Sequence, residues 1–219
     1  MSVAGFYFDN ANTFCISLDS RPDRWERMRT RFEYFNMDVT RWPASTSTTV
    51  TDIFTEHLNG AQRGCAQSHI NIYRHMIKNN IKYALILEDD ACFDLEWKQR
   101  LNEFSVENME NIHMILLNAS EPITPPYQWV IQQEQYLTGG YIISLKGARW
   151  ILDHYQNCFY SADWMTTRLQ LLGNSYSYFP WLIVQEGRDS TIGNQCEADH
   201  QKVLRCLGEI QYSIENHYL

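Results

Sequence analysis

The sequence predicts an α/β protein with a mostly parallel central sheet flanked by helices. Short apolar runs alternate along the chain with segments whose apolar residues recur every three or four positions, and this pattern is typical of strands alternating with amphipathic helices. One of the apolar runs ends abruptly in three consecutive carboxylates. No internal repeat or low-complexity tract interrupts the alternation, so we expect a single domain over residues 1–219.

The first part of the chain supplies a strand, a helix and a second strand. Residues 13–18 form a short apolar run and predict the first strand. Residues 19–22 have the features of a helix start, a side-chain cap followed by a proline in the first turn. The helix continues through residues 25–35, where large apolar side chains lie on one face. A second strand is expected over residues 38–42, followed by a serine- and threonine-rich loop over residues 45–51.

The remaining chain continues the alternation. A helix over residues 65–80 carries apolar side chains at helical spacing, and the apolar run over residues 83–87 predicts a buried strand. A strand over residues 112–117 is followed by a proline-containing loop over residues 121–127. The last predicted elements are a strand over residues 141–144 and helices over residues 146–155 and 163–172. Strand–helix–strand connections of this kind favour parallel pairing within one sheet.

Composition and charge restrict the class of protein. The chain has 219 residues, of which 44% are hydrophobic and 14% aromatic, and this fits a globular domain with a substantial core. The net charge of -8 argues against nonspecific binding to nucleic acid or to an anionic membrane, which needs a basic face. No apolar run approaches the roughly 18 residues of a membrane span. The six cysteines form no Cys-x-x-Cys pair and no signal peptide is evident, so we expect a cytoplasmic location.

The three carboxylates Glu88-Asp89-Asp90 are the most informative local feature. They directly follow the strand predicted over residues 83–87, and ligands of open α/β sheets bind in the crevice beyond the strand ends. Clustered negative charges repel one another, and a hard divalent cation bound through oxygen relieves that repulsion. The alternative is an acidic loop exposed to solvent. The local sequence leaves both interpretations open.

Several segments, taken in their order along the chain, resemble the motifs of glycosyltransferase family 25, which includes lipooligosaccharide and collagen galactosyltransferases. They are residues 16–24, 64–69, 87–90, 139–148 and 163–164, with a late segment over residues 180–185. The resemblance implies a GT-A fold with a nucleotide-binding half over about residues 1–110 and an acceptor half over about residues 111–219. It also implies a metal-dependent, inverting transfer of a hexose from a UDP-sugar donor to a hydroxyl of a glycan or glycoprotein acceptor.

The resemblance further assigns donor and metal residues. Asp90 is expected to bind Mn²⁺ or Mg²⁺ directly, and Glu88 is expected to act at the metal through water or on a donor hydroxyl. The side chain of Asp89 should point to the opposite side of an extended segment, so a structural role and a donor contact are both open. The expected donor-binding residues are Ser17, Leu18, Asp19, Arg21, Arg24, Ala44, Ser68, His69, Glu88, Asp89, Gly139 and Gly140.

Some of these assignments have an alternative in ordinary structural chemistry. Arg21 and Arg24 suit bidentate contacts with ribose or phosphate, but Arg24 on a helix surface would equally pair with Asp19 or Asp23. A buried histidine such as His69 is commonly a hydrogen-bonded core residue, and we do not expect it to be catalytic. Aromatic side chains suited to an acceptor platform, or to the core, are Tyr127, Trp129, Tyr141, Trp164 and Trp181.

Asp163 is the residue that the resemblance implies as the catalytic base. An inverting transfer needs one carboxylate to take the proton of the acceptor hydroxyl. The alternative is that Asp163, two positions after Ser161, only serves the start of a helix. GT-A enzymes often recruit a late residue as an extra metal ligand, and the sequence offers Asp189 and His200 for that role without choosing between them.

Three other functions compete with catalysis. A silent nucleotide-sugar or glycan-binding domain would keep the fold without turnover. A phosphoacceptor receiver domain is disfavoured, because its acid pair follows the first strand in a chain of about half this length. A structural scaffold does not explain three adjacent acids at a strand end. Ser17 stands where the family commonly has asparagine, which leaves the donor sugar and the acceptor open.

Overall fold

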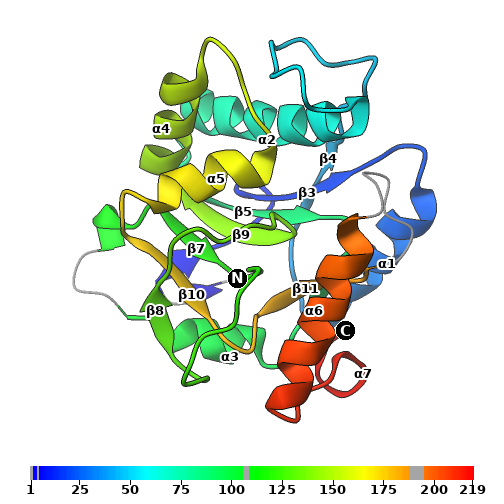
Figure 1. The fold of residues 1–219 in the computed structure, drawn as a ribbon, viewed down its shortest axis with the longest axis vertical. Helices are drawn as coiled ribbons and strands as arrows, with labels where there is room; N and C mark the ends of the chain where they lie inside the picture. The colour runs from blue at the N-terminus through cyan, green and yellow to red at the C-terminus, as the bar shows by residue number, and fades with distance from the viewer. Residues whose placement is uncertain (1, 4, 106–108, 188–194) are drawn as a thin grey trace.

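The computed structural model describes residues 2–3, 5–105, 109–187 and 195–219, and a seven-stranded sheet crosses this described part of the chain (Figure 1). In spatial order the strands are β4 (Thr40–Pro43), β3 (Thr13–Ser17), β5 (Tyr83–Glu88), β9 (Gly140–Ser144), β7 (Met114–Leu116), β10 (Ser175–Tyr178) and β8 (Trp129–Ile131). β3 is parallel to β4 and β5, and β7 is parallel to β10. β9 is antiparallel to both neighbours and β8 is antiparallel to β10. Five of these seven strands therefore run in one direction, which confirms the predicted fold class.

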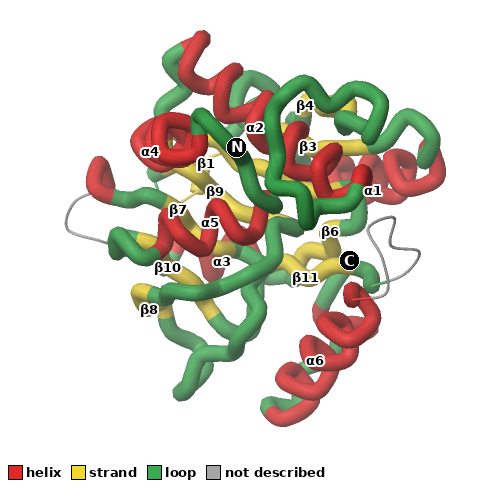
Figure 2. The backbone as a smooth tube through the Cα atoms, turned by 45° about the horizontal axis from the view of Figure 1, so that its top comes forward, coloured by secondary structure: helices red, strands yellow, loops and turns green. Residues whose placement is uncertain are grey.

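Helices cover both faces of the sheet. α2 (Gly60–Asn79), α4 (Leu145–Tyr155) and α5 (Ala162–Gln170) contact one another on one face (Figures 1 and 2). α1 (Pro22–Tyr34) and α3 (Trp97–Asn102) pack on the other face. The alternation of side chains along β5 separates two cores, because Ala84 and Ile86 belong to the cluster beneath α2, α4 and α5, whereas Leu85 and Leu87 belong to the cluster beneath α1 and α3.

The elements α3, β8 and β10 were not predicted from the sequence, and neither were the remaining ones. The remaining ones are the short pair β1 (Ser2–Val3) and β2 (Phe6–Tyr7), the antiparallel pair β6 (Ala91–Phe93) and β11 (Ile183–Gln185), a 3-10 turn at Met109–Asn111, α6 (Gln195–Glu209) and α7 (Ile214–His217). β6 follows directly after the acidic segment, so its pairing with β11 places a late part of the chain beside the acids. In the part of the chain that the structure describes, no helix combines the length and the apolar character needed to cross a membrane.

Two helix starts differ from the sequence prediction. α2 begins at Gly60, five residues before the predicted start at residue 65, because Asn59 and Gln62 form a reciprocal capping box with two bonds of 2.9 Å. α1 begins with Pro22 as predicted, but the expected side-chain cap is absent and Arg21 occupies the N-cap position without a capping bond. Its first turn instead carries Asp23, and the negative charge of this side chain interacts favourably with the positive end of the helix dipole.

Candidate functional site

The three acids lie where two neighbouring parallel strands end. β5 is buried over residues 84–87, and its last residue, Glu88, is in register with Ile16 of β3. The backbone amide of Glu88 donates a hydrogen bond of 3.0 Å to the carbonyl oxygen of Gly139, so the backbone pairing of β5 with β9 also ends at Glu88. Because β3 and β5 are parallel, their carboxyl ends meet at one edge of the sheet. This is the position predicted from the sequence.

A pocket of about 300 Å³ opens at this edge. It brings together seven of the predicted donor and metal residues, namely Leu18, Arg24, Ala44, Ser68, Glu88, Asp89 and Asp90. Its other walls are Ile16, the loop over residues 45–47, Ala61 and Cys65 of α2, Asn118, Leu137, the segment with Gln185 and Gly187, and His200 and Val203 of α6. Both apolar and polar groups line this pocket, as is usual in small-molecule sites.

The carboxylate of Glu88 is held from two sides. Its Oε1 accepts a hydrogen bond of 2.7 Å from Thr138 Oγ1 and lies 3.4 Å from His69 Nε2. Its Oε2 accepts a bond of 3.3 Å from the Gln185 side-chain amide. Burial disfavours the charged form, but the contacts with His69 and Thr138 outweigh burial, so the pKa of Glu88 lies below its usual value. Glu88 is therefore a fixed anion.

Asp90 has the opposite electrostatic character. Burial, followed by the negative charge of Glu88, raises the pKa of Asp90 to about 7. Gln185 Nε2 also lies 3.3 Å from Asp90 Oδ1, so a single amide bridges the two carboxylates. At neutral pH the Asp90 carboxyl is poised between protonation states, and a cation at the site would favour its ionised form.

Asp89 turns toward α1. Its Oδ1 accepts a hydrogen bond of 2.8 Å from Arg24, and its Oδ2 accepts one of 3.3 Å from the backbone amide of Leu18. Burial raises the pKa of Asp89 against the opposing charge of Arg24. The same guanidinium lies 3.7 Å from Asp90 Oδ2. Asp89 thus fixes the loop after β3, and Arg24 is a buried counter-ion of the acids in place of the surface pairing with Asp19 or Asp23.

Six predicted donor residues lie outside the pocket lining, and three of them are Ser17, Asp19 and Arg21. Asp19 pairs with Arg41 at 2.9 Å, and Arg21 pairs with Asp23 at 2.9 Å, both at the surface. Ser17 is fully buried, and its carbonyl oxygen accepts a hydrogen bond of 3.0 Å from the amide of Ala44. Ser17 therefore connects β3 to the pocket wall, and a donor contact from any of these three side chains stays a prediction.

The two adjacent glycines are explained by close packing. A Cβ atom on Gly139 would lie 2.6 Å from Gln185 Cγ, and one on Gly140 would lie 2.4 Å from Ile183 Cδ1. Because glycine has no side chain, the segment that carries Gln185 can pack closely against the sheet at both positions. Neither glycine is among the residues that line the pocket, so direct contact with a donor also stays a prediction.

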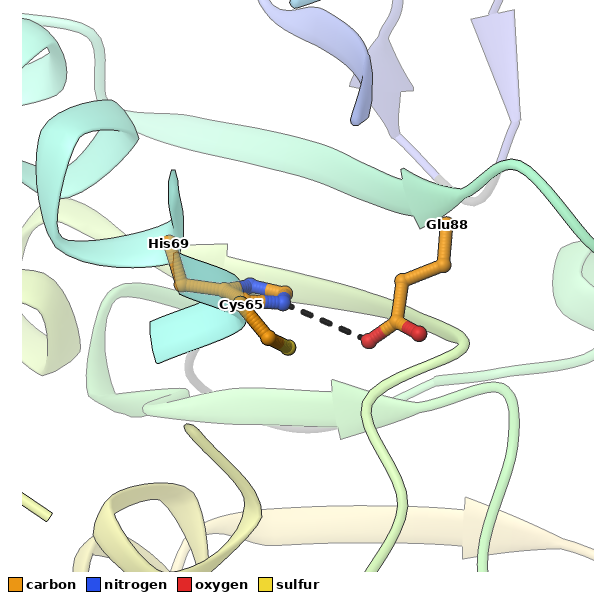
Figure 3. A group of neighbouring side chains, drawn as sticks. All are labelled: Cys65, His69 and Glu88. Atoms are coloured by element: carbon orange, nitrogen blue, oxygen red, sulfur yellow. Dashed lines mark hydrogen bonds and ion pairs between the residues drawn. The ribbon is translucent and has the colours of Figure 1, made fainter. Parts of the chain in front are cut away.

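Ser68 and His69 have separate roles at the base of the pocket. Ser68 Oγ accepts a hydrogen bond of 2.8 Å from the amide of Ser45 and donates one of 2.8 Å to the carbonyl of Gly64, so it anchors the pocket loop to α2. His69 is fully buried and connects Glu88 to Tyr141. Figure 3 shows Cys65, His69 and Glu88 turned toward one another.

The residues present fit a hard divalent cation. Glu88 and Asp90 supply carboxylate oxygens, and the pocket is also lined by Asn118, whose side-chain oxygen is buried without a hydrogen-bond partner among the described residues. Oxygen donors of this kind suit Mn²⁺ and Mg²⁺. Of the two late candidates, His200 lines the pocket, whereas Asp189 lies outside the described residues.

Asp163 does not line the pocket. It occupies the first turn of α5, where its Oδ1 accepts a hydrogen bond of 2.8 Å from the amide of Trp164. Sequence reasoning missed Cys65, Asn118, Thr138 and Gln185 as individual site residues. Cys65 and Gln185 lie inside the quoted motif segments, whereas Asn118 directly follows a predicted strand, a position that could have identified it.

Comparisons with known proteins agree with the motif resemblance. The family model described as glycosyltransferase family 25 (LPS biosynthesis protein) matches residues 10–128. Procollagen galactosyltransferase 1-B of Xenopus laevis is 28% identical over 168 residues, covering 64% of this chain and 28% of that protein. A Bos taurus protein named "Probable inactive glycosyltransferase 25 family member 3" is 26% identical over 166 residues, covering 64% of this chain and 28% of that protein. This chain thus matches little more than a quarter of the length of these relatives.

A solved structure is also similar in part. It is a glycosyltransferase involved in the glycosylation of the major capsid of PBCV-1, with 9% sequence identity and a TM-score of 0.37. The match covers 87% of this chain and 98% of that chain. A likeness at this level supports no conclusion about the site.

Proposed function

This chain belongs to glycosyltransferase family 25, and from that membership we propose that it transfers a hexose from a UDP-sugar to a hydroxyl of a glycan or glycoprotein, with inversion and with the help of a divalent metal. The observation that carries the proposal is the pocket at the carboxyl ends of β3 and β5, in which the fixed anion Glu88 and the poised Asp90 lie side by side.

The pocket divides by chemistry into two parts. Ile16, Leu18 and Ala44 give an apolar wall suited to a base and ribose, and the acids lie beyond it. We propose that Asp90 binds Mn²⁺ or Mg²⁺ directly, with Glu88 near it and His200 as the late ligand. A metal held there would neutralise the charge that develops on the leaving diphosphate. Glu88, held by Thr138 and Gln185, would then orient a hydroxyl of the donor sugar.

Binding of UDP tests the donor site. We expect calorimetric titration to show UDP binding that depends on Mn²⁺, and we expect Asp90→Asn to abolish the metal-dependent part. Asp153→Asn is the control, because Asp153 is an exposed carboxylate on α4 outside the pocket. Equal binding with and without Mn²⁺ would refute the metal-dependent donor site, and absence of binding in both conditions would refute the UDP-sugar assignment.

Asp163 is our proposal for the catalytic base, on the family resemblance alone. Removing a general base typically lowers the rate about 10²- to 10⁴-fold. Asp163→Asn should therefore lower kcat of transfer by that factor and leave UDP binding unchanged, because the residue lies outside the pocket lining. A variant that transfers sugar at the normal rate would assign Asp163 to the start of α5 only.

A catalytically silent domain is the second candidate function, because the name of one relative describes that protein as inactive. Turnover separates the two. We expect slow hydrolysis of a UDP-hexose by the purified protein, with UDP-galactose and UDP-glucose as the first donors to compare, and collagen-like peptides and glycans as the first acceptors because of the relative's name. Donor binding without hydrolysis or transfer would favour the silent domain. The cytoplasmic location stays a prediction.

A further inference from the structure

Cys65, His69 and Glu88 bring three different ligand types to one point beside the donor pocket. One ligand atom of each residue lies within 4.8 Å of the others. Cys65 and His69 are four residues apart on α2 and so share one helix face, which is directed at the end of β5 (Figure 3). We propose that these three residues form a second cation site, for a borderline-soft divalent ion of the Zn²⁺ class.

The distances suit tetrahedral coordination. Zn²⁺ bonds of about 2.0–2.3 Å to nitrogen, oxygen and sulfur place neighbouring ligand atoms roughly 3.4–3.7 Å apart. His69 Nε2 and Glu88 Oε1 are already 3.4 Å apart. Only a modest movement of the Cys65 thiol is then needed to complete three ligands. Cys65 and Glu88 also line the pocket, so the fourth position is open toward it, as in zinc sites that bind a further ligand.

The imidazole of His69 is oriented from behind. Its Nδ1 is 2.7 Å from the hydroxyl of Tyr141, which is in turn 2.6 Å from the hydroxyl of Tyr73. All three side chains are fully buried, and the His69 and Tyr141 rings are stacked with centroids 5.7 Å apart. A partner on the second ring nitrogen that fixes the tautomer is the usual support of a metal-bound histidine. Here the imidazole would donate its Nδ1 proton to Tyr141 and leave Nε2 for the ion.

This site differs from the proposed donor-metal site in its chemistry. A thiolate and an imidazole select Zn²⁺-class ions, whereas carboxylates and carbonyl oxygens select Mn²⁺ and Mg²⁺. Glu88 faces both sites with different atoms, since Oε1 contacts His69 and Thr138, and Oε2 contacts the amide of Gln185 that also reaches Asp90. Binding would displace the thiol proton of Cys65, so affinity should rise with pH.

Cobalt titration of the metal-stripped protein tests the proposal. Co²⁺ reports coordination by sulfur through a near-ultraviolet charge-transfer band, which we expect to saturate at one equivalent and to be displaced by Zn²⁺. Cys65→Ser should abolish the band, and Cys158→Ser, which removes another half-buried thiol, should leave it unchanged. Tyr141→Phe should weaken Co²⁺ binding roughly 10- to 100-fold. A wild-type protein without the band, or a band that survives in Cys65→Ser, would overturn the site.

Two further measurements make the result independent of folding defects and of the donor site. In the wild-type protein, Zn²⁺ should slow alkylation of Cys65 and leave that of Cys158 unchanged, and equal alkylation of Cys65 with and without Zn²⁺ would overturn the proposal. Asp90→Asn should retain the cobalt band while losing Mn²⁺-dependent UDP binding. The cation site and the proposed function can therefore fail separately.

Discussion

Arg24 is the buried cation of the acidic site. Its side chain is 6% exposed, lies 2.8 Å from Asp89 Oδ1 and 3.7 Å from Asp90 Oδ2, and comes from the first turns of α1. Removing one partner of a buried ion pair leaves an uncompensated charge, which costs about 3–5 kcal/mol. We expect Arg24→Met to lower the free energy of unfolding in urea by that amount.

The matched control for Arg24 is Arg21, three residues earlier. Arg21 pairs with Asp23, whose side chain is 49% exposed, and solvent screens such surface pairs so that they add little to stability. Arg21→Met should therefore change the free energy of unfolding only slightly. Equal losses in the two variants would mean that Arg24 does not compensate the buried acids.

Asp52 gives a pH-dependent prediction. Arg74 forms two bonds to its carboxylate at 2.6 and 2.7 Å, and Gln67 donates a third at 2.6 Å. The hydrogen bonds from Arg74, followed by that from Gln67, outweigh burial and lower the pKa of Asp52. A lowered pKa in the folded state stabilises the protein above about pH 4 and loses that contribution as the pH falls through the folded-state pKa.

Asp52→Asn should therefore lower the free energy of unfolding at neutral pH by about 1–2 kcal/mol, after allowance for the exposure of Arg74. The difference between variant and wild type should shrink as the pH falls below about 4. Urea unfolding across this pH range measures it, with the exposed Asp38→Asn as control. A difference that is the same at acid and neutral pH would show that the charge of Asp52 contributes nothing.

At single positions, the sequence predicted where the acidic side chains lie better than it predicted which residues they contact. The pattern of apolar residues followed by Glu88-Asp89-Asp90 correctly placed the acids at a strand end, and the extended geometry correctly separated Asp89 from its neighbours. It could not show that Arg24 pairs with Asp89, because 65 residues separate them and only the packing of α1 against the sheet brings them together. The same holds for Gln185, which is 97 residues from Glu88.

At the level of elements, the pocket depends on the close packing of α2 against its loop. A Cβ atom on Gly64 would lie 2.5 Å from the carbonyl oxygen of Ser45. This contact is too short, and the backbone of Ser45 cannot move away as easily as the end of a flexible side chain. The backbone amide of Ser45 also donates a hydrogen bond to Ser68 Oγ, and both residues line the pocket. Overpacking of this kind typically costs about 1–3 kcal/mol. Gly64→Ala should therefore weaken UDP binding and lower thermal stability together.

Gly208 provides the control for Gly64. It is an exposed residue of α6, and a Cβ atom there would have no neighbour within 4 Å. Gly208→Ala should leave UDP binding unchanged and stabilise the helix by up to about 1 kcal/mol, because alanine has the higher helix propensity. Normal UDP binding by Gly64→Ala would show that the loop over residues 45–47 can move without affecting the site.

Hydrophobic periodicity predicted β3, β4, β5, β7 and β9 of the central sheet but not how they pair. The strands over residues 13–18, 83–87 and 141–144 were expected and correspond to β3, β5 and β9. The pattern could not show that β9 is reversed between β5 and β7, since a buried strand reads the same in either direction. β6 and β11 escaped prediction because each is only three residues long and each needs the other as its partner.

For the whole molecule, the two halves that the resemblance implies are interleaved within one sheet. β3, β4 and β5 come from residues before 111, and β9, from the later part, pairs with β5 along five residues. β11 pairs with β6 across the same division, and the backbone of Leu219 bonds that of Phe93 in both directions at 2.9 Å. Each half shares its sheet with the other, and the single domain stays a prediction that unfolding can test.

The last prediction follows from this interleaving. We expect thermal unfolding followed by far-ultraviolet circular dichroism and by tryptophan fluorescence to give one coincident transition, because separating β9 from β5 opens both hydrophobic cores at once. In the presence of Mn²⁺, UDP at about 100 times its dissociation constant should raise stability by about 2.7 kcal/mol relative to Mn²⁺ alone and shift both probes equally. A fragment of residues 1–110 should not fold, because the edge of β5 would be unpaired. Two separate transitions, or a folded fragment, would instead divide the chain into independent domains, and the pocket built from both would then require docking between them.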